Sequence, residues 1–362
     1  MYRNTYLEIN LDCLLHNAEY FINKTGKKLI AVVKANGYGT IDYMEARTLQ
    51  EIGVDFFAVS SLDEAINLRK NGITDEILIL GSVPEDMLDM VRKNDFSIVT
   101  LSKDFVMNAN LKKVKIHLKL DTGMNRIGIK PSEAREVMKI LKKKEANIEG
   151  IMSHFSSADT DKEYSESQYY QLKNCYDDLD YEFKYIHMSA TDASFIVKDN
   201  LCNANRIGLG LLGYSSYEND LKPVVRLYSE VSAVKQLKEG ETVSYGRHYT
   251  SDGKGYILTI PIGYADGFWR SNTGKEVYVD GEFGKIVGSI CMDQMMVWTE
   301  NFHEVGSKVE LFGEHIDLNL RARELDTIVY ELLTGFSDRL TRVFVRNGRT
   351  MVHIDPRFGR IY

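Results

Sequence analysis

The sequence has little proline and no clustered cysteine. Five prolines occur in 362 residues, so no proline-rich linker is visible, and we expect any two domains to pack closely. The four cysteines, Cys13, Cys175, Cys202 and Cys291, are widely spaced and form no CxxC pair. This pattern implies neither a disulfide framework nor a zinc site, so we expect a reducing, cytoplasmic setting and no bound metal.

Long apolar runs and basic runs are also missing. No stretch reaches the roughly 18 apolar residues of a membrane-spanning helix, and the first ten residues, MYRNTYLEIN, hold no apolar core of signal-peptide length. The net charge is -7, the pI is near 5.7, and no basic run is interleaved with aromatic residues. We therefore expect no nucleic-acid partner and no membrane segment in the chain as given. That the chain is a module of a longer membrane protein stays open.

What the chain does contain is an ordinary globular composition. Hydrophobic residues make up 44% and charged residues 27%, so disorder is not indicated. A chain of this length can form one large barrel with a second domain, or two to three smaller domains.

Strand-like apolar runs alternate with helical patterns over about the first two hundred residues. The runs are Leu29–Val33, Phe56–Val59, Ile77–Leu80, Ser97–Thr100, Val114–Leu120, Ile148–Met152, Phe183–His187 and Ala204–Leu209. The helical patterns include Cys13–Asn23, with Asp12 as its cap, Tyr43–Ile52, Ser61–Asn71, Glu85–Lys93 and Pro131–Lys144. This alternation predicts an α/β fold with a (β/α)8 TIM barrel over residues 11–220. A doubly wound sheet competes, but the GxGxxG fingerprint is absent after the first of these runs.

From about Pro223 the pattern changes to strands separated by glycine turns. The expected strands are 224–234, 255–262, 276–279, 285–297, 308–312 and 342–354, with one helix at 322–334. Residues 1–10 alternate as a further short strand. The sequence therefore predicts a mainly β C-terminal domain formed by residues 1–10 and 221–362.

The stretch Leu29–Gly39, LIAVVKANGYG, joins a buried strand to Lys34 and a glycine turn that carries Tyr38. An amine at the carboxyl end of a buried strand can hold an aldehyde cofactor as a Schiff base. A lysine that extends from the strand end into solvent explains the same residues equally well.

This stretch resembles the lysine motif of alanine racemases, a family dependent on pyridoxal 5'-phosphate (PLP) that joins an eight-stranded barrel to a β domain. It departs from the family pattern at Gly37, Thr40 and Ile41, where the family usually shows alanine, histidine and glycine. The resemblance implies that PLP is bound covalently at Lys34.

Further barrel motifs resemble the family in order. Arg206 matches the arginine that faces the pyridine nitrogen, and Gly208 and Leu209 supply backbone N–H groups for the phosphate. The resemblance implies hydroxyl contacts from Tyr38 and Thr191, although Thr191 is the weakest match on the barrel. An ordinary salt bridge is the alternative for Arg206.

The runs around Lys119 and His154 complete the barrel match. In KLDTGMNR, the resemblance implies that Arg126 contacts the cofactor and the substrate carboxylate, and that Lys119 can be carbamylated to orient it. His154, in SHF, resembles the histidine that contacts the cofactor. A purely structural histidine is the alternative.

The second domain carries the motifs VSYG, PIGYADG and GSICMDQ. By resemblance, Tyr245 is the second catalytic base and reaches the active site of the other subunit, which implies a homodimer with shared active sites. Tyr264 would line the substrate entrance, and the backbone of Met292 would contact the substrate carboxylate. Without the resemblance, Tyr245 reads as a half-buried strand residue.

These matches predict a PLP-dependent racemase that interconverts L- and D-alanine by a two-base mechanism and supplies D-amino acids for the cell wall. Two departures concern the substrate: Asp338 replaces a tyrosine and Ser289 replaces an arginine. Serine racemases of the vancomycin-resistance type depart at the same tyrosine, so we expect serine to be accepted too. A racemase for serine or another small amino acid, a related PLP decarboxylase and a non-catalytic PLP-binding protein are the alternatives.

Overall fold

The computed structural model describes residues 3–197 and 200–361. The chain divides into two compact units, one formed by Leu14–Lys222 and the other by Met1–Cys13 together with Pro223–Tyr362. The chain therefore enters and leaves the first unit once, and its first strand belongs to the second unit.

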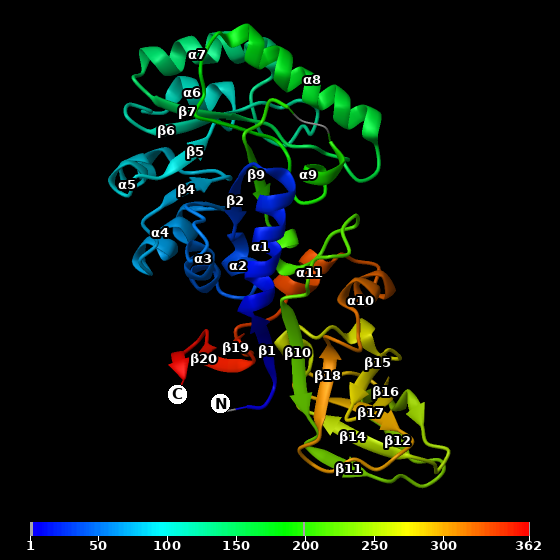
Figure 1. Ribbon diagram of the computed structural model, residues 1–362. Coiled ribbons are helices and arrows are strands. Elements are labelled where there is room, and N and C mark those ends of the chain that lie inside the picture. The colour runs from blue at the N-terminus through cyan, green and yellow to red at the C-terminus, as the bar shows by residue number, and fades with distance from the viewer. Residues whose placement is uncertain (1–2, 198–199, 362) are drawn as a thin grey trace. The chain divides into compact units, whose positions relative to one another are not determined.

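In the described part of Leu14–Lys222, eight parallel strands close into a barrel in sequence order (Figure 1). These strands are β2 (Lys28–Val32), β3 (Phe56–Val59), β4 (Glu76–Ile79), β5 (Ser97–Val99), β6 (Lys115–Lys119), β7 (Asn147–Met152), β8 (Tyr185–His187) and β9 (Ala204–Ile207). Each of the eight predicted runs overlaps one strand, so the predicted TIM barrel is confirmed. Most residues of these strands are apolar and buried because both faces of each strand are covered.

Helices precede and connect the barrel strands. They are α1 (Leu11–Thr25), α3 (Asp42–Gln50), α4 (Leu62–Lys70), α5 (Leu88–Lys93), α6 (Lys103–Asn108), α7 (Ala134–Lys143), α8 (Lys162–Leu179) and α9 (Ala193–Ile196). The expected cap of the first helix was wrong. The side chain of Asn10 accepts from the N–H groups of Asp12 and Cys13 at 2.9 and 3.1 Å, whereas Asp12 lies inside the helix and accepts from the N–H of Asn347.

In the described part of the second unit, eleven strands form one sheet in the order β11-β14-β17-β16-β15-β18-β10-β1-β19-β20-β21. Their bounds are β1 (Tyr6–Asn10), β10 (Val225–Glu230), β11 (Ala233–Lys235), β14 (Tyr256–Ile260), β15 (Glu276–Val279), β16 (Glu282–Val287), β17 (Met295–Thr299), β18 (Lys308–Phe312), β19 (Thr341–Arg346), β20 (Arg349–Asp355) and β21 (Gly359–Ile361). β1 pairs antiparallel with β10 and parallel with β19. A mainly β second part is therefore confirmed.

Four expected elements in this unit are wrong as single pieces. The range 224–234 covers β10 and the start of β11, and the range 342–354 covers most of β19 and β20 with a turn at 347–348 between them. The range 285–297 covers the end of β16, a loop at 288–294 and the start of β17, because Gly288 adopts a φ of 67° and turns the chain. The range 322–334 covers the end of α10 (Leu318–Glu324) and all of α11 (Val329–Thr334). These helices are separated at Asp326, whose φ is 54°.

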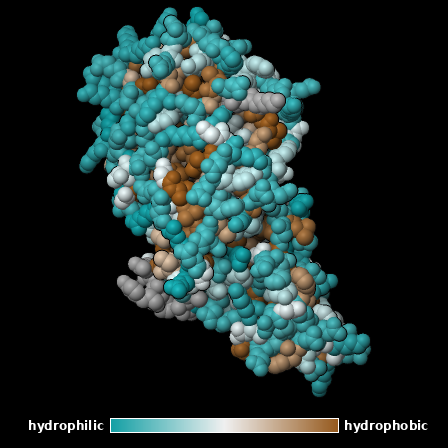
Figure 2. Space-filling view, in the orientation of Figure 1, coloured by the Kyte–Doolittle hydropathy of each residue, from teal (hydrophilic) through white to brown (hydrophobic). Residues whose placement is uncertain are grey.

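Hydrophilic residues cover most of the face shown in Figure 2, and hydrophobic residues appear there in small separate patches. Within residues 3–197 and 200–361, no helix is both long and apolar enough to cross a membrane.

Candidate active site

Lys34 begins a left-handed turn directly after the first barrel strand. Positive φ angles run through Ala35 (53°), Asn36 (54°), Gly37 (64°) and Tyr38 (53°). A left-handed backbone costs roughly 1–2 kcal/mol for a residue with a Cβ atom, so this turn needs specific support. Part of it is backbone hydrogen bonding, because the N–H of Gly37 donates to the carbonyl of Val33 at 2.9 Å.

Glu64, at the first turn of α4, provides further support. One of its carboxylate oxygens accepts from the N–H of Ala35, and the other accepts from the N–H of Ser60, both at 2.7 Å. The carboxylate therefore ties the Lys34 turn to the end of the neighbouring strand β3. Lys34 is half-buried, and its pKa is lowered by burial and by the charge of Arg126, although Glu64 acts in the opposite direction.

Arg206, on β9, is a buried cation held by uncharged acceptors. Nη1 lies 2.6 Å from Nδ1 of His187. Nη2 lies 3.0 Å from Nδ1 of His154 and donates to the carbonyls of Ser153 and Met188 at 2.9 and 2.8 Å. Within the described chain, no carboxylate pairs with Arg206, so the alternative of an ordinary salt bridge does not hold. Burial lowers the pKa of Arg206 to about 10, so it stays charged at neutral pH.

His187 connects this guanidinium to a further histidine, His117. Nε2 of His187 lies 2.8 Å from Nδ1 of His117. Because Arg206 can only donate, Nδ1 of His187 accepts, its proton sits on Nε2, and that proton is donated to His117. The proton of His117 then sits on its own Nε2, which has no partner among the described residues. Burial and the charge of Arg206 lower the pKa of His117 to about 3 and that of His187 well below 6.5, so both rings are neutral.

His154 follows β7 and completes the set around Arg206. Its pKa is lowered well below 6.5, first by burial and then by Arg206, Lys119 and Arg126. The ring is therefore neutral, accepts from Arg206 through Nδ1 and carries its proton on Nε2. This places a donor on the side of the ring away from Arg206.

Lys119 ends β6 and is 5% exposed. Burial, followed by the charges of Arg206 and Arg126, lowers its pKa to about 8, and Asp121 opposes this shift. The loop that carries Arg126 is shaped by Asp121, whose carboxylate accepts from the N–H of Asn125 at 2.9 Å and pairs with Lys130 at 2.6 Å. Three cations, Lys34, Lys119 and Arg126, are thus close enough to act on His154 and on one another.

A small polar recess lies at the end of β9. A Cβ on Gly208 would lie 2.1 Å from the hydroxyl of Tyr38, so only glycine fits there. The hydroxyl oxygen of Thr191 accepts from the N–H of Gly210 at 3.1 Å, which leaves its proton available. The N–H groups of Gly208 and Leu209 have no acceptor in the described chain. Two hydroxyls and two amides therefore gather where an anion can bind.

The second unit carries the other four predicted site residues, which are Tyr245, Tyr264, Met292 and Asp338. Tyr245 starts a short 3-10 turn and is 76% exposed, so it is not a half-buried strand residue. The turn is braced on both sides: the hydroxyl of Ser244 donates to the carbonyl of Ser289 at 2.6 Å, and that of Ser289 donates to the carbonyl of Tyr245 at 3.0 Å.

Tyr264 and Met292 lie on two loops that are bonded to each other. The N–H of Tyr264 donates to the carbonyl of Cys291 at 3.1 Å, and that of Ala265 donates to the carbonyl of Met292 at 3.0 Å. A Cβ on Gly263 would lie 2.2 Å from the carbonyl of Cys291, so glycine permits this approach. Tyr264 is 44% and Met292 is 53% exposed.

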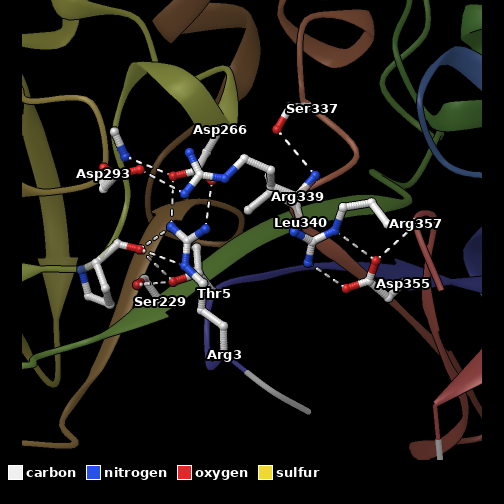
Figure 3. A network of polar contacts seen from close by, with 12 residues as sticks. Arg3, Thr5, Ser229, Asp266, Asp293, Ser337, Arg339, Leu340, Asp355 and Arg357 are labelled. Carbon is white, nitrogen blue, oxygen red and sulfur yellow. Dashed lines mark hydrogen bonds and ion pairs between the residues drawn. The ribbon is translucent and has the colours of Figure 1, made fainter.

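Charged residues join these loops to the segment that holds Asp338 (Figure 3). Buried Asp266 pairs with Arg3 at 2.6 Å, and Arg339 pairs with Asp293 at 2.7 Å and with Asp266 at 3.5 Å. Arg339 is therefore paired with two carboxylates other than that of its neighbour Asp338. Asp338 itself is exposed and makes no hydrogen bond or ion pair within the described chain, although its charge acts on buried Arg342.

Comparison with known proteins identifies the family. Residues 9–216 match the family described as "Alanine racemase, N-terminal domain", and residues 224–344 match "Alanine racemase, C-terminal domain". The chain belongs to the alanine racemase family. An alanine racemase of Staphylococcus epidermidis is 38% identical over an alignment of 364 positions, which covers 95% of each chain. Alanine racemase 1 of Bacillus subtilis is 36% identical over 98% of this chain and 96% of its own.

Solved structures agree with this family. An alanine racemase of Clostridium difficile has a TM-score of 0.91 at 35% identity, with 97% of this chain and 98% of the other covered. The Bacillus anthracis alanine racemase with bound L-Ala-P has a TM-score of 0.90 at 31% identity, and 98% of each chain is covered. A histidine racemase of Leuconostoc mesenteroides has a TM-score of 0.86 at 27% identity, with 95% of this chain and 98% of the other covered.

Alanine racemases are PLP-dependent, so PLP is the cofactor of this chain, as the sequence predicted. The residues fit it: a half-buried amine, a buried cation without a carboxylate partner, and a recess of hydroxyls and N–H groups lie at the carboxyl ends of the barrel strands. No group of three His, Cys, Asp or Glu side chains in the described ranges could hold a metal ion.

Sequence reasoning assigned no role to three residues that shape this site: Glu64, His117 and His187. The signal for His117 was its spacing, because it precedes Lys119 by two residues and so shares its face of the strand. Glu64 gave no comparable signal, since an acidic residue in a first helical turn is common.

Proposed function

We propose that this protein interconverts L- and D-alanine with PLP as its cofactor. The observation that carries this proposal is Arg206, a buried cation held by two neutral imidazoles and by no carboxylate of the described chain. When bound, the cofactor withdraws electrons from the substrate Cα and makes its proton acidic. Arg206 beside the pyridine nitrogen disfavours a second positive charge there. This moderates the withdrawal and favours return of the proton to the same carbon.

Lys34 supplies the amine that binds the cofactor covalently. The hydroxyls of Tyr38 and Thr191 and the N–H groups of Gly208 and Leu209 hold its phosphate. In support, the hydroxyl of Tyr38 lies against Gly208 in the recess at the end of β9, the hydroxyl proton of Thr191 is available, and both N–H groups lack an acceptor in the described chain. His154 contacts the ring and is braced from behind by Arg206 at 3.0 Å.

Lys34 and Tyr245 act as the two bases. The amine of Lys34 removes the proton from one face of the substrate Cα, and the hydroxyl of Tyr245 returns one to the other face, with the roles exchanged in the reverse reaction. Burial and Arg126 lower the pKa of Lys34, which raises the fraction of the neutral, basic amine near neutral pH.

Arg126 and the N–H of Met292 bind the substrate carboxylate. The N–H of Met292 has no acceptor in the described chain and its residue is exposed, so it is open to a ligand. Lys119 orients Arg126 after carbamylation, in which the neutral amine adds to carbon dioxide and releases one proton. A pKa of about 8 for Lys119 leaves roughly a tenth of it neutral at pH 7.

The active enzyme is a head-to-tail homodimer in which Tyr245 of the partner subunit completes each site. Exposure of Tyr245, Tyr264 and Met292 in the single chain, at 76%, 44% and 53%, supports this arrangement. Large apolar or aromatic side chains exposed on one domain are typical of an interface. Tyr264 then lines the substrate entrance.

Serine is a second substrate, because Asp338 replaces the tyrosine that crowds the alanine methyl group in the family. Arg339 is occupied by Asp266 and Asp293, so Asp338 is not neutralised by its neighbour. Its carboxylate can accept a hydrogen bond from a substrate hydroxyl, worth about 1 to 3 kcal/mol. Pairing of Asp338 with Arg342, whose pKa it acts on, is the competing role.

The test is to add L-alanine and D-alanine separately and to follow circular dichroism. A racemase drives both signals to zero. A decarboxylase removes the signal of one enantiomer with release of carbon dioxide, and a non-catalytic PLP-binding protein changes neither. Either of the last two results overturns the proposal.

A further inference from the structure

Two of the three departures from the family pattern near Lys34 lie in one contact. Thr40 and Glu45 are each 1% exposed, and the hydroxyl of Thr40 lies 2.6 Å from Oε1 of Glu45. A Cβ added to Gly37 would lie 2.6 Å from the hydroxyl of Thr40 and 3.1 Å from the carboxyl carbon of Glu45. The alanine usual in the family therefore does not fit at Gly37 while Thr40 and Glu45 are present.

The third departure adds strain to the same turn. Ile41 adopts a φ of 126° and a ψ of 107°, in a position where the family usually has glycine. A β-branched residue is a clear outlier at positive φ. The segment from Lys34 to Ile41 thus needs more support here than a glycine at 41 would require.

The hydrogen-bond geometry fixes which group donates. The hydroxyl of Thr40 lies 2.9 Å from the carbonyl of Gly37 as well as 2.6 Å from Glu45. It has one proton, and the carbonyl can only accept. Both bonds form together only if Thr40 donates to Gly37 and the carboxylic acid of Glu45 donates to Thr40.

We propose that Gly37, Thr40 and Glu45 form a positioning unit, in which protonated Glu45 holds Thr40 and Thr40 holds the turn that presents Lys34 and Tyr38 to the cofactor. The unit rests on the proposed function, since it acts through the PLP-binding lysine and the phosphate-binding tyrosine. All three residues are buried and act through the turn, so they are positioning residues rather than catalytic ones.

The surroundings of Glu45 favour its protonated form. Burial raises its pKa to about 8; the contact with the Thr40 hydroxyl opposes this shift, and the carboxylate of Asp42 on the same helix adds to it. On α4, Asn67 binds Asp42 through both carboxylate oxygens, and Glu64 binds the N–H of Ala35. Within residues 3–197 and 200–361, no cation pairs with Glu45.

A pH dependence follows from this arrangement. The folded-state pKa of Glu45 is raised above its usual value of 4.5, so its stabilising effect is complete below about pH 4.5 and is lost as the pH rises through about 8. Once ionised, Glu45 can only accept, so Thr40 must donate to it and the carbonyl of Gly37 loses the hydroxyl. The turn is then less firmly held, and PLP is released faster.

The experiment measures the rate of PLP release from the full-length holoenzyme by visible absorbance at pH 7 and pH 9. Glu45→Gln keeps a neutral donor and acceptor at all pH values, and Glu45→Ala has neither. We expect Glu45→Ala to release PLP about tenfold faster than wild type at pH 7, the effect of one lost buried hydrogen bond. Glu45→Gln should match the wild type at pH 7 and release more slowly than the wild type at pH 9.

Asp63→Asn, an exposed carboxylate change on α4, is the matched control and should follow the wild type at both pH values. The proposal is overturned if Glu45→Gln and wild type accelerate equally between pH 7 and pH 9, or if Glu45→Ala retains PLP as the wild type does. Wild-type protein that binds no PLP at all would overturn the proposed function instead.

A second comparison tests the contact with Gly37. Gly37→Ala should speed PLP release, because its Cβ would meet the hydroxyl of Thr40 at 2.6 Å. The Thr40→Ala variant lacks the hydroxyl. Adding Gly37→Ala to it should therefore speed PLP release by a smaller factor than Gly37→Ala does in the wild type. Additive effects on the logarithm of the release rate would contradict the positioning unit.

Discussion

Nη1 of Arg206 lies 2.6 Å from Nδ1 of His187, and Nε2 of His187 lies 2.8 Å from Nδ1 of His117. The guanidinium of Arg206 is therefore oriented by the neutral imidazoles of His187 and His117. The tautomers of both rings follow because Arg206 can only donate. A carboxylate in the place of His187 would neutralise this charge. An imidazole holds the guanidinium and leaves its charge intact.

Replacing His187 should separate orientation of Arg206 from its charge. His187→Leu leaves a buried guanidinium donor without an acceptor, which costs about 1 to 3 kcal/mol of unfolding free energy, and we expect kcat for alanine to fall at least tenfold. His187→Asn keeps an acceptor near the position of Nδ1 and should recover part of kcat. Equal loss in both variants, or no loss in His187→Leu, would show that the ring does not position Arg206.

The buried neutral histidines should make the protein sensitive to acid. The pKa of His117 is about 3 in the folded chain, whereas the ordinary value for an unburied histidine is 6.5. Between these values the unfolded chain binds a proton that the folded chain does not, so the unfolding free energy falls as the pH falls. The slope reaches about 1.4 kcal/mol per pH unit for each such histidine.

Denaturant unfolding of wild type and His117→Asn between pH 7 and pH 5 measures this effect. Asparagine can accept from His187 but does not titrate, so the variant should lose less stability on acidification than the wild type. Glu45 acts in the opposite direction in both proteins and cancels in the difference. Equal loss of stability on acidification in the variant and the wild type would contradict this account of His117.

The sequence predicted the barrel well because its signal is repeated. Each strand from β2 to β9 is buried on both faces and reads as an apolar run, as Phe56–Val59 does. Element ends were predicted less well, since they depend on single residues. Asn10 rather than Asp12 caps α1, and positive φ angles at Gly288 and Asp326 divide elements that hydropathy alone joins.

The position of Lys34 after an apolar run suggested a cofactor lysine, because barrel active sites lie at the carboxyl ends of the strands. Arg206 and Lys119 could be named only through the resemblance to the family motifs. The residues that support this lysine turn could not be named from the sequence. Glu45 and Thr40 are an acid and a hydroxyl five residues apart, and only the folded chain shows that they meet at 2.6 Å.

Shared active sites can be tested by mixing two inactive chains. Lys34→Ala lacks the amine and Tyr245→Phe lacks the hydroxyl, so neither homodimer has both bases. A mixed dimer has one site with both, and after subunit exchange we expect part of the racemase activity to return. The proposed arrangement fails if exchange is verified with labelled chains and the mixture stays inactive.

The role of Asp338 can be tested by restoring the family residue. Asp338→Tyr should lower kcat/KM for L-serine relative to L-alanine by about tenfold, the value of one hydrogen bond to a charged group. Asp326→Asn removes an exposed carboxylate elsewhere in the same unit and serves as the control. An unchanged serine-to-alanine ratio in Asp338→Tyr would mean that Asp338 serves Arg342 and not the substrate.

Covalent attachment of PLP to Lys34 is the central claim, and borohydride reduction followed by peptide mapping tests it most directly. Reduction fixes the cofactor on the lysine that holds it, and Lys34→Ala provides the matched control. We predict that the label lies on the peptide containing Lys34 and is absent from the variant. A label on Lys119 or on any other lysine would contradict the assignment of the active site.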